Sequence, residues 1–599
     1  MDTKSFYGKR PNRYGRLTRY ILTGGVPDDG NKSSDDVDSS HDGDEVSSVA
    51  GTESESDETD SESADGGQVH NSLSDSESDD TSRGSVRAGS DNDKWSETST
   101  ATGLPKPFTR DSGPFIILSP DAKPTDYFQL LFPESLFTLM CNETNRYAAS
   151  RNKVADTCVP ELKAFLGLII AMGIHRLPQL RDYWDGFHWV LNVPQFTQVF
   201  TRSRFMHLWS NLHLVDNAQQ LPRTDPSHDR LFKVRPVIRI LQDTFLEHYY
   251  PRQNVSVDES MVRFKGRSSM KQYLPLKPIK RGFKVWSASC ACCGYLLNFQ
   301  IYTGSEGSQE RGLAHRVVTD LCLPMLAHRQ HTVYVDNFFT SMPLLTELES
   351  NGISLCGTYR TNRIGFPKEL TDKETLKKMK RGDVVARYKG NTSCVVWMDK
   401  RPVYLVSNAF MPDTTSVKRK NADGSTSLIS CPVGVANYNR YMGGVDLTDQ
   451  LKGSYGYNRK SKRWWFRLFF HMVDLAVINS FILYRHCYQI HCHPPLKFMP
   501  MSQLQFRCQL ADGLVNHFSS RKQRGRAVAS PVVSLTPSGH KIQDLRQLGV
   551  VKGRCEYCSL GEHKRRKRKE TVYGCPKCVK RLCPANCWTE FHSKLLPGH

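Results

Sequence analysis

The sequence predicts a multidomain α/β protein with an acidic N-terminal region and a small cysteine-rich domain near its C-terminal end. Three observations lead to this prediction. Short apolar runs alternating with polar residues, a pattern typical of β-strands, recur between residues 255 and 407. Apolar residues at helical spacing come before and after these runs. Closely spaced cysteines occupy residues 555–587, which indicates a metal-stabilised domain.

Residues 1–103 are predicted to be disordered, with a short basic arm followed by an acidic stretch. Residues 27–100 contain 22 Asp and Glu against 4 Lys and Arg, and few apolar residues. Because the formal net charge of the whole chain is +20, the residues after 100 carry about +33. A positive surplus of that size suits nucleic acid, whose phosphates bind Lys and Arg. A generically basic protein is the alternative.

We expect neither a secretory signal nor a membrane span. The first 25 residues are basic but contain no apolar core of sufficient length. Residues 466–484 are the most apolar stretch, but Arg467, His471, Asp474 and Asn479 interrupt it, which favours a buried amphipathic helix. The 18 cysteines therefore belong to a reducing compartment, where close spacing is more typical of metal ligands than of disulfides.

Residues 104–252 are predicted to be a helical region. Residues 160–173 begin with Pro, continue with apolar residues on a broad face and end at Gly, which are signals of a helix. Further helices are expected at residues 202–214 and 236–248.

The β-rich part begins at residue 253. Strands are predicted at 255–258, 283–290, 295–302, 332–336 and 353–359, with a hairpin turn near Cys293 and Gly294. A helix at 343–352 separates the last two strands, so a mixed α/β sheet is expected. Residues 367–430 have strands of their own at 384–388, 392–397 and 403–407 and are predicted to be a small inserted domain. Helices return at 445–488, and residues 527–553 have the composition of a linker.

Carboxylates stand at three places where they could meet. Asp258 and Asp336 each end an alternating strand, and Asp446 and Asp449 are three residues apart on one helix face after a Gly pair. Two strand-end acids with acids on a later helix suit an RNase H-like polynucleotidyl transferase. In such enzymes two Mg²⁺ or Mn²⁺ ions about 3.5 to 4 Å apart are held by carboxylate oxygens.

Several motifs resemble those of the piggyBac-type DDE transposases: DYFQLLF, ELKAFLGLIIAMG, VDESMVRFKGR, YVDNFFTS, GTYRTNR and YNRYMGGVDLTDQL. The resemblance runs from about residue 124 to the C-terminal end. It implies that Asp258, Asp336 and Asp446 are the catalytic, metal-binding triad, and that Asp449 is an additional acid near the metals. Glu259 is not expected to bind metal, because it points to the other side if the strand continues through it.

The resemblance also implies a domain organisation and a homodimer. A helical dimerisation and DNA-binding region would cover residues 104–252 and 457–526, and an RNase H-like core would cover 253–366 and 431–456. The insertion would cover 367–430, and a zinc-binding domain 554–599.

The reaction implied by the resemblance is cut-and-paste DNA transposition in the nucleus. Water frees a 3′-hydroxyl at each terminal inverted repeat, this hydroxyl forms a hairpin on the opposite strand, and the reopened end joins a TTAA target. Two alternatives remain open: a host-adopted DNA-binding or chromatin protein without catalysis, and a general hydrolytic nuclease that uses the same carboxylates.

Basic and aromatic residues are expected to contact the DNA. The segment KPIKRGFK supplies Lys277, Lys280, Arg281 and Lys284, although a solvated loop would look the same. Arg360, Arg363 and Trp464 match DNA-contacting or active-site positions of the family. Arg565, Arg566 and Lys567 belong to the run HKRRKRK, which is also typical of a nuclear localisation signal.

The C-terminal cysteines have the spacing of structural zinc sites. The family resemblance implies two Zn²⁺ ions in a cross-brace, which needs eight ligands. The expected ligands are Cys555, Cys558, Cys575, Cys578, Cys583, Cys587 and His592, with His563 as the candidate for the eighth. A third cluster, Cys290, Cys292 and Cys293, lies in the predicted hairpin without a paired partner motif and is not expected to bind metal.

Overall fold

The computed structural model describes residues 94–99, 107–185, 193–275, 277–304, 312–411, 413–421, 423–491, 499–521, 540–559, 570–584 and 586–595. These residues fall into two compact units that divide between Phe518 and Ser519. Most of the region predicted to be disordered lies outside the described residues. Residues 94–99 depart from that prediction, because Ser96 and Tyr388 exchange two backbone hydrogen bonds of 2.8 Å.

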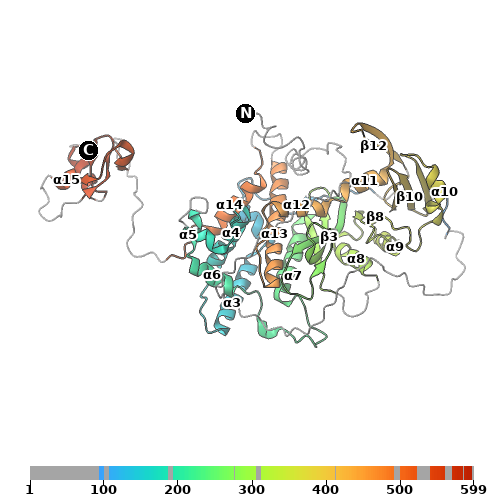
Figure 1. The fold of residues 1–599 in the computed structure, drawn as a ribbon, viewed down its shortest axis with the longest axis horizontal. Helices are drawn as coiled ribbons and strands as arrows, with labels where there is room; N and C mark the ends of the chain where they lie inside the picture. The colour runs from blue at the N-terminus through green and yellow to red at the C-terminus, as the bar shows by residue number, and fades with distance from the viewer. Residues whose placement is uncertain are drawn as a thin grey trace. The chain divides into compact units, whose positions relative to one another are not determined.

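A nine-stranded sheet forms the centre of the larger unit (Figure 1). Its order is β4-β5-β3-β7-β8-β11-β10-β9, with β6 also paired to β5. β3, β7 and β8 are parallel, and the other pairs are antiparallel, which confirms the predicted mixed sheet. The strands are β3 (Asn254–Arg263), β4 (Gln272–Tyr273), β5 (Arg281–Cys290), β6 (Leu296–Ile301), β7 (Thr332–Val335), β8 (Ser354–Thr358), β9 (Val384–Lys389), β10 (Thr392–Met398) and β11 (Pro402–Ser407).

Strand β3 is longer than the sequence pattern predicted. It was expected to end at Asp258, but it continues to Arg263 because β5 pairs with it from Val255 to Arg263. The predicted hairpin turn near Cys293 is confirmed, since β5 and β6 are antiparallel neighbours. Asp258 therefore lies within β3, at the point where its other neighbour, β7, stops.

Three strands of the predicted inserted domain belong to the main sheet. We expected the strands of residues 367–430 to belong to a small inserted domain, but β11 pairs with β8, and β10 and β9 follow it. The reason is a shared core: Trp397 and Leu405 pack with Tyr334 and Cys356, which come from β7 and β8. A separate two-stranded hairpin, β12 (Thr414–Lys420) with β13 (Thr426–Pro432), completes this part.

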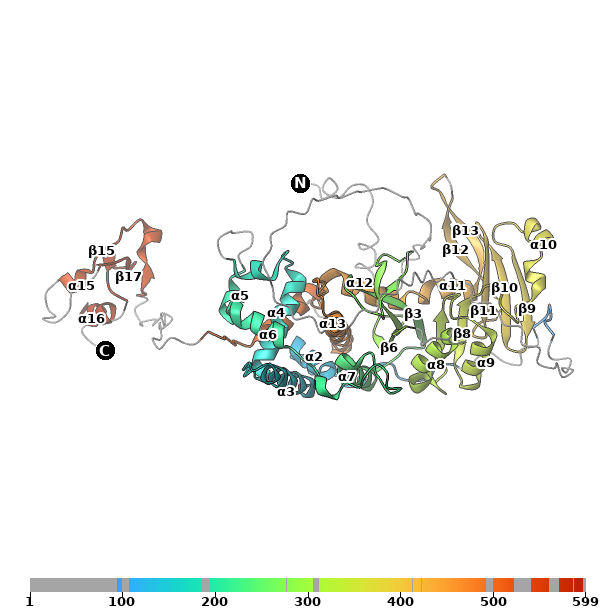
Figure 2. The same cartoon turned by 60° about the horizontal axis from the view of Figure 1, so that its bottom comes forward.

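Helices α3 to α6 lie at one end of the larger unit, strands β9 to β13 lie with α10 at the other, and β3 and α13 lie between them (Figures 1 and 2). The three predicted helices before residue 253 are confirmed as α4, α6 and α7, and the one at 343–352 as α9. The helices are α2 (Pro124–Leu131), α3 (Glu134–Ser150), α4 (Val159–Ile174), α5 (Pro194–Val199), α6 (Arg202–Asn211), α7 (Arg235–Glu247), α8 (Leu313–Leu326), α9 (Met342–Ser350), α10 (Lys373–Lys378), α11 (Val433–Tyr441), α12 (Gly444–Tyr455), α13 (Trp464–His491) and α14 (Gln503–Val515). A short pair, β1 (Gly113–Pro114) with β2 (Tyr249–Tyr250), accompanies them.

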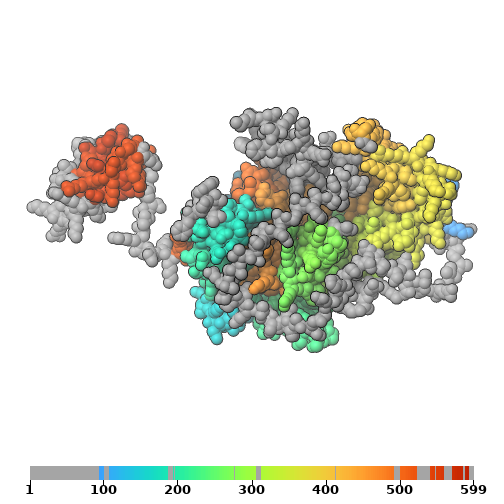
Figure 3. Space-filling view, viewed as in Figure 1, coloured from blue at the N-terminus to red at the C-terminus, as the bar shows by residue number. Residues whose placement is uncertain are grey.

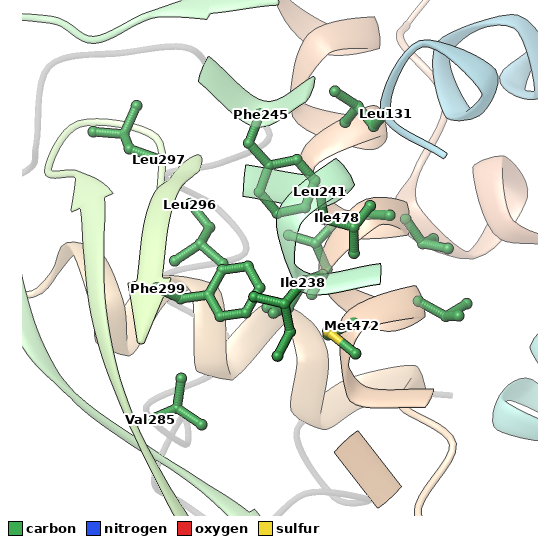
Figure 4. Packing of buried hydrophobic residues seen from close by; sticks show 14 of the residues in the cluster. Leu131, Ile238, Leu241, Phe245, Val285, Leu296, Leu297, Phe299, Met472 and Ile478 are labelled. Carbon is green, nitrogen blue, oxygen red and sulfur yellow. The ribbon is translucent and has the colours of Figure 1, made fainter. Parts of the chain in front are cut away.

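Helix α13 forms the core between the helical part and the sheet. It is long and apolar enough to cross a membrane, but its apolar stretch is entirely buried inside the protein, as predicted for residues 466–484. Figure 4 shows Met472 and Ile478 of α13 among side chains from α2, α7, β5 and β6. The Asn479 amide is also satisfied, because it bonds both backbone groups of Leu296 on β6 at 2.8 and 2.9 Å. The apolar stretch is therefore a core element of this fold.

The smaller unit is built from short elements around cysteines. β14 (Gln543–Asp544), β17 (Tyr573–Cys575) and β18 (Lys580–Arg581) form one sheet, and β15 (Gly553–Arg554) pairs with β16 (Glu570–Thr571). Helices α15 (Glu556–Ser559) and α16 (Asn586–Leu595) complete it. Residues 540–553 were predicted to be linker, but β14 pairs with β17 and Leu545 is buried, so this stretch belongs to the folded unit.

Candidate functional site

Asp258 and Asp336 lie on neighbouring strands of the sheet. The last pair in the parallel register of β3 and β7 is Val257 with Val335, so the next residue on each strand is an aspartate. Neighbouring strands are about 4.8 Å apart. Both valines are fully buried, which fixes the register, because a slip of one residue would turn the apolar side chains to the wrong face. The structure thus brings these two carboxylates together.

Helix α12 lies against the same strand. Gly444, at its first turn, is so close to β3 that a Cβ atom would come 2.4 Å from Ser256 Oγ. Only glycine fits there, which explains the second glycine of the pair, Gly444. Further along, Asp449 Oδ1 accepts a hydrogen bond of 2.7 Å from Ser260 Oγ on β3. Ser256 and Ser260 flank Asp258 at two-residue spacing, so α12 covers the face of β3 that carries this acid.

The two acids of α12 differ in their surroundings. Asp446 is exposed and its charge acts on Asp258. Asp449 is half-buried, and the oxygen that accepts from Ser260 also accepts from Lys452 Nζ at 2.6 Å. Asp449 is therefore partly neutralised by its own helix, whereas Asp446 remains available to a ligand at the strand edge.

Electrostatics favour a cation between these acids. Burial raises the pKa of Asp258 to about 7, and the charges of Asp336 and Asp446 act in the same direction. Burial also raises the pKa of Asp336. Crowded carboxylates of this kind disfavour one another's ionised form, and a divalent cation removes that cost. Since all the donors are carboxylate oxygens, the residues fit Mg²⁺ or Mn²⁺.

Glu259 pairs with two of the lysines that were predicted to bind DNA. Lys284 Nζ and Lys277 Nζ lie 3.0 and 3.2 Å from its carboxylate oxygens. Burial would raise the pKa of Glu259, but the two lysines lower it. Lys277 also feels the charge of Asp258, which raises the pKa of Lys277. Glu259 thus holds cationic side chains at the edge of the acid site.

Two of the arginines predicted to bind DNA, Arg360 and Arg363, hold the loop that follows β7. Arg363 donates to the carbonyl oxygens of Phe338 and Thr340 at 2.7 and 2.5 Å. Arg360 Nε donates to the side-chain oxygen of Asn337 at 3.3 Å. These contacts make Arg363 a support of the loop that begins at the second aspartate, a role that the sequence does not reveal.

The remaining predicted DNA contacts have varied positions. Lys280 and Arg281 are exposed, and Arg281 lies over the Tyr273 ring at 5.0 Å. Trp464 begins α13 and is half-buried, whereas Trp465 is buried in the core. Arg565, Arg566 and Lys567 lie outside the described residues.

Tyr438 of α11 is a neighbour of the acid site that the sequence did not identify. Its hydroxyl lies 3.3 Å from Thr358 Oγ1, and Thr358 follows the last residue of β8 that pairs with β7, so it lies beside Asp336. Burial raises the pKa of Tyr438, and the charges of Asp336 and Asp258 add to this effect. No local pattern separates Tyr438 from the other tyrosines of its segment.

Eight Cys and His side chains of the smaller unit form two groups that could each hold a metal ion. Within each group all ligand atoms lie within 4.8 Å of one another. Seven of the eight were predicted, and the eighth is His540, whose Nδ1 lies 3.2 Å from Cys578 Sγ. His563, the predicted eighth ligand, lies outside the described residues, and both groups already contain four ligands without it. One group is His540, Cys575, Cys578 and His592. The other group is Cys555, Cys558, Cys583 and Cys587.

The two groups interleave along the chain. One group takes the second Cys pair and the two outer histidines, and the other takes the first and third Cys pairs. His592 also bonds the Trp588 carbonyl oxygen through Nδ1 at 2.8 Å, which orients Nε2 toward the thiols. His540 was missed because it stands 15 residues before the first cysteine, outside any short ligand spacing.

Comparison with known proteins agrees with this arrangement. A family model described as Transposase IS4 matches residues 123–481, which is more than half of the chain. The chain belongs to this family, in its piggyBac-type branch. The matched part of this transposase-family chain includes Asp258, Asp336, Asp446 and Asp449 and ends before the smaller unit.

Individual relatives extend this result. Human PiggyBac transposable element-derived protein 3 is 28% identical over 487 residues, covering 79% of this chain and 76% of its own length. Human PiggyBac transposable element-derived protein 2 is 29% identical over 387 residues, covering 62% of this chain and 63% of its own length. A solved piggyBac transposase synaptic complex with hairpin DNA has the same fold, with a TM-score of 0.60 and 21% identity over 80% of this chain and 100% of that chain.

Proposed function

We propose that this chain is a DNA transposase that performs metal-dependent cut-and-paste transposition. The observation that carries the proposal is the meeting of Asp258 and Asp336 on adjacent parallel strands beneath a helix with Asp446 and Asp449. The crowding of Asp258, Asp336 and Asp446 is costly without a cation. The catalytic core in this proposal is RNase H-like.

Each side chain has a proposed role in phosphodiester attack. Asp258, Asp336 and Asp446 would hold two Mg²⁺ or Mn²⁺ ions, which supply Lewis-acid stabilisation of the reacting phosphate when bound. Asp449 fixes α12 to β3 through Ser260. Because Lys277 is close to both the acids and the edge of the site, it is suited to a nonbridging phosphate oxygen.

The proposed reaction repeats one type of step. Water attacks the transposon end and leaves a 3′-hydroxyl, this hydroxyl attacks the opposite strand to give a hairpin, and the hairpin is reopened. The freed 3′-hydroxyl then joins a TTAA target. No covalent protein intermediate is needed, because every step exchanges one phosphodiester oxygen for another.

The other parts of the chain have supporting roles in this proposal. The helical regions, residues 104–252 and 457–526, would bind the terminal repeats and form a homodimer. The exposed Lys280 and Arg281 and the half-buried Trp464 would contact that DNA. The basic run that contains Arg565, Arg566 and Lys567 would add contacts at the transposon end and direct the chain to the nucleus.

An excision and reintegration assay in cells tests the function. We expect inverted repeats bordered by TTAA to flank the coding sequence, and the donor plasmid carries a marker between copies of these repeats. We expect a rejoined donor and marker insertions at TTAA. A host-adopted protein without catalysis, in line with the "transposable element-derived" names of its relatives, would give binding without excision. A hydrolytic nuclease would give broken donor without insertion.

Replacing Arg363 with lysine should slow nicking without changing how salt affects DNA binding. The lysine ammonium group cannot donate to the carbonyl oxygens of Phe338 and Thr340 in the way that the two guanidinium nitrogens do. The loop after Asp336 should therefore shift. A misplacement of about 1 Å costs up to about 100-fold in rate. Nicking rates and DNA affinity across a salt series check this result.

Lys280 provides the matched comparison for Arg363. As an exposed cation it should contact phosphate only, so Lys280→Ala should reduce the slope of log affinity against log salt by about one. If Arg363→Lys changes the slope and leaves the nicking rate of bound DNA intact, Arg363 is a DNA contact and not a support of the loop.

The smaller unit is proposed to hold two structural Zn²⁺ ions. The full chain should contain two equivalents of zinc, and His540→Ala should weaken only the group that contains Cys575, Cys578 and His592. Metal analysis by mass spectrometry after mild chelation should then find one equivalent. The His563→Ala variant should retain both equivalents of zinc. If His563→Ala loses zinc and His540→Ala retains it, the eighth ligand is His563 and not His540.

A further inference from the structure

The turn between β5 and β6 contains a cluster of three thiols that the proposed reaction does not use. Cys290 is buried, and Cys292 and Cys293 are half-buried. The Tyr249 hydroxyl joins two of them, at 3.7 Å from Cys290 Sγ and 3.2 Å from Cys293 Sγ. Backbone bonds hold the turn closed, since Gly294 N–H donates to the Cys290 carbonyl oxygen at 2.9 Å.

The surroundings of Cys290 stabilise a thiolate. Hydrogen bonds from the thiols of Cys292 and Cys293 hold the pKa of Cys290 well below its usual range, and the backbone N–H groups of Arg252 and Cys292 also donate to this sulfur. The Tyr249 hydroxyl is a further donor. Charges on the three sulfurs raise the pKa of the Arg252 guanidinium against the effect of burial, so a cation lies within reach of the cluster. A sulfur with this many donors is a nucleophile, not an inert core thiol.

The arrangement suits thiol exchange better than metal binding. Each metal-binding group of the smaller unit combines four ligands from separate segments, whereas this turn supplies three thiols from one segment. A disulfide requires only one close pair. Cys290 and Cys293 have the Cys-X-X-Cys spacing of dithiol redox sites.

The same turn supports the helix that carries the acids. The Gly294 carbonyl oxygen accepts a hydrogen bond of 2.7 Å from Thr448 Oγ1. Leu447 packs on Gly294, where an added Cβ would come 2.9 Å from Leu447 Cγ. At the start of the helix, a Cβ on Gly444 would come 2.9 Å from the Ala291 backbone. A change in the turn must therefore displace the first two turns of α12, because the contacts leave no free space.

We propose that Cys290 and Cys293 are a redox-active dithiol, and that its oxidation by a peroxide displaces α12. Cys293 is half-buried, so solvent reaches its sulfur, and its thiol donates to Cys290. As the Cys293 sulfur attacks hydrogen peroxide, its proton passes along this hydrogen bond to Cys290, and a sulfenic acid and hydroxide form. Cys290 then attacks the sulfenic sulfur, the S–S bond forms and the S–O bond breaks. In total, two thiols lose two protons and two electrons, and the peroxide becomes two waters.

The experiment uses the reduced, zinc-loaded full chain and hydrogen peroxide as the oxidant. Peptide mass spectrometry should find a Cys290–Cys293 cross-link, lighter by two hydrogens and reversed by dithiothreitol. Cys292→Ser should retain the cross-link and Cys293→Ser should lose it. Cys394→Ser, which removes an isolated buried thiol of β10, is the matched control and should retain it. Sulfenic acid without a cross-link, or a cross-link from Cys290 to Cys292 only, would overturn the assignment.

Hydrogen exchange and nicking assays measure the effect of oxidation on α12. Oxidation should increase amide exchange in α12 at least tenfold in the parent chain and leave Cys293→Ser unchanged. Unchanged exchange in the oxidised parent would overturn the link to α12. The effect on nicking rests on the proposed function: oxidised chain should lose nicking and regain it with dithiothreitol. If the reduced chain nicks no DNA, the proposed function fails, while the cross-link and exchange results still decide the redox pair.

Discussion

Asp258→Asn should abolish nicking of transposon ends while leaving DNA binding and stability nearly unchanged. The substitution keeps the size of the side chain but removes the charge that a divalent cation needs. It also removes a source of repulsion, since the charges of Asp336 and Asp446 act on Asp258. Loss of one member of a catalytic unit lowers the rate on the order of 10³-fold or more. Gel assays of nicking with Mg²⁺ and of binding without metal measure the two effects separately.

Asp320→Asn is the matched control for this prediction. Asp320 is an exposed acid on α8 that pairs with Arg316, so its loss should leave both nicking and binding unchanged. If Asp258→Asn nicks at the parental rate, the acids of β3, β7 and α12 do not form the proposed metal site, even though they meet at one strand edge.

Asp474→Ala should strongly destabilise the larger unit. Asp474 on α13 accepts from Arg507 Nη1 at 3.2 Å and from the Tyr457 backbone N–H at 3.0 Å. The Arg507 side chain is 0% exposed. Removing its carboxylate partner leaves a buried, unpaired charge, which typically costs about 3 to 5 kcal/mol. Denaturant unfolding followed by tryptophan fluorescence measures the loss.

Two comparisons separate this effect from a general loss of side-chain contacts. Glu374→Ala breaks the pair with Lys377, whose side chains are 71% and 73% exposed, and should change stability by less than about 1 kcal/mol. Replacing Asp474 with Leu and Arg507 with Met together should recover most of the loss, because neither charge remains buried. Equal stability of Asp474→Ala and Glu374→Ala would contradict the prediction.

The buried pair of Asp474 and Arg507 also contacts the end of α12, the helix that carries Asp446. Arg507 donates to the Tyr455 carbonyl oxygen at 3.4 Å, at the last residue of α12, and Tyr457 follows two residues later. Gly173 of α4 lies against the same carbonyl, where a Cβ would come 2.2 Å from it. Helix α12 is thus fixed at its end by the helical region and at its start by the thiol turn, so both regions control where Asp446 lies.

Several features followed from the sequence because they depend on neighbouring residues. The alternation of valines and polar residues located β3 and β7, and Pro160 and Gly173 marked the start and end of α4. Close spacing identified seven of the eight potential metal ligands in the smaller unit. Patterns of this kind are local, so they identify an element or a ligand pair without its distant partners.

The tertiary structure decided which of these local elements meet. β11 joins β8, across a segment of more than 40 residues, because Leu405 and Trp397 bury surface against β7 and β8. The ligand His540 and the neighbour Tyr438 reach their sites through such long-range packing. Sequence alone therefore determined the family, and it predicted the acids and all six candidate cysteine ligands. Only the fold decided that Arg363 holds a loop, that Glu259 pairs with lysines, and that a thiol turn supports the acid helix, because these contacts join residues far apart in the chain.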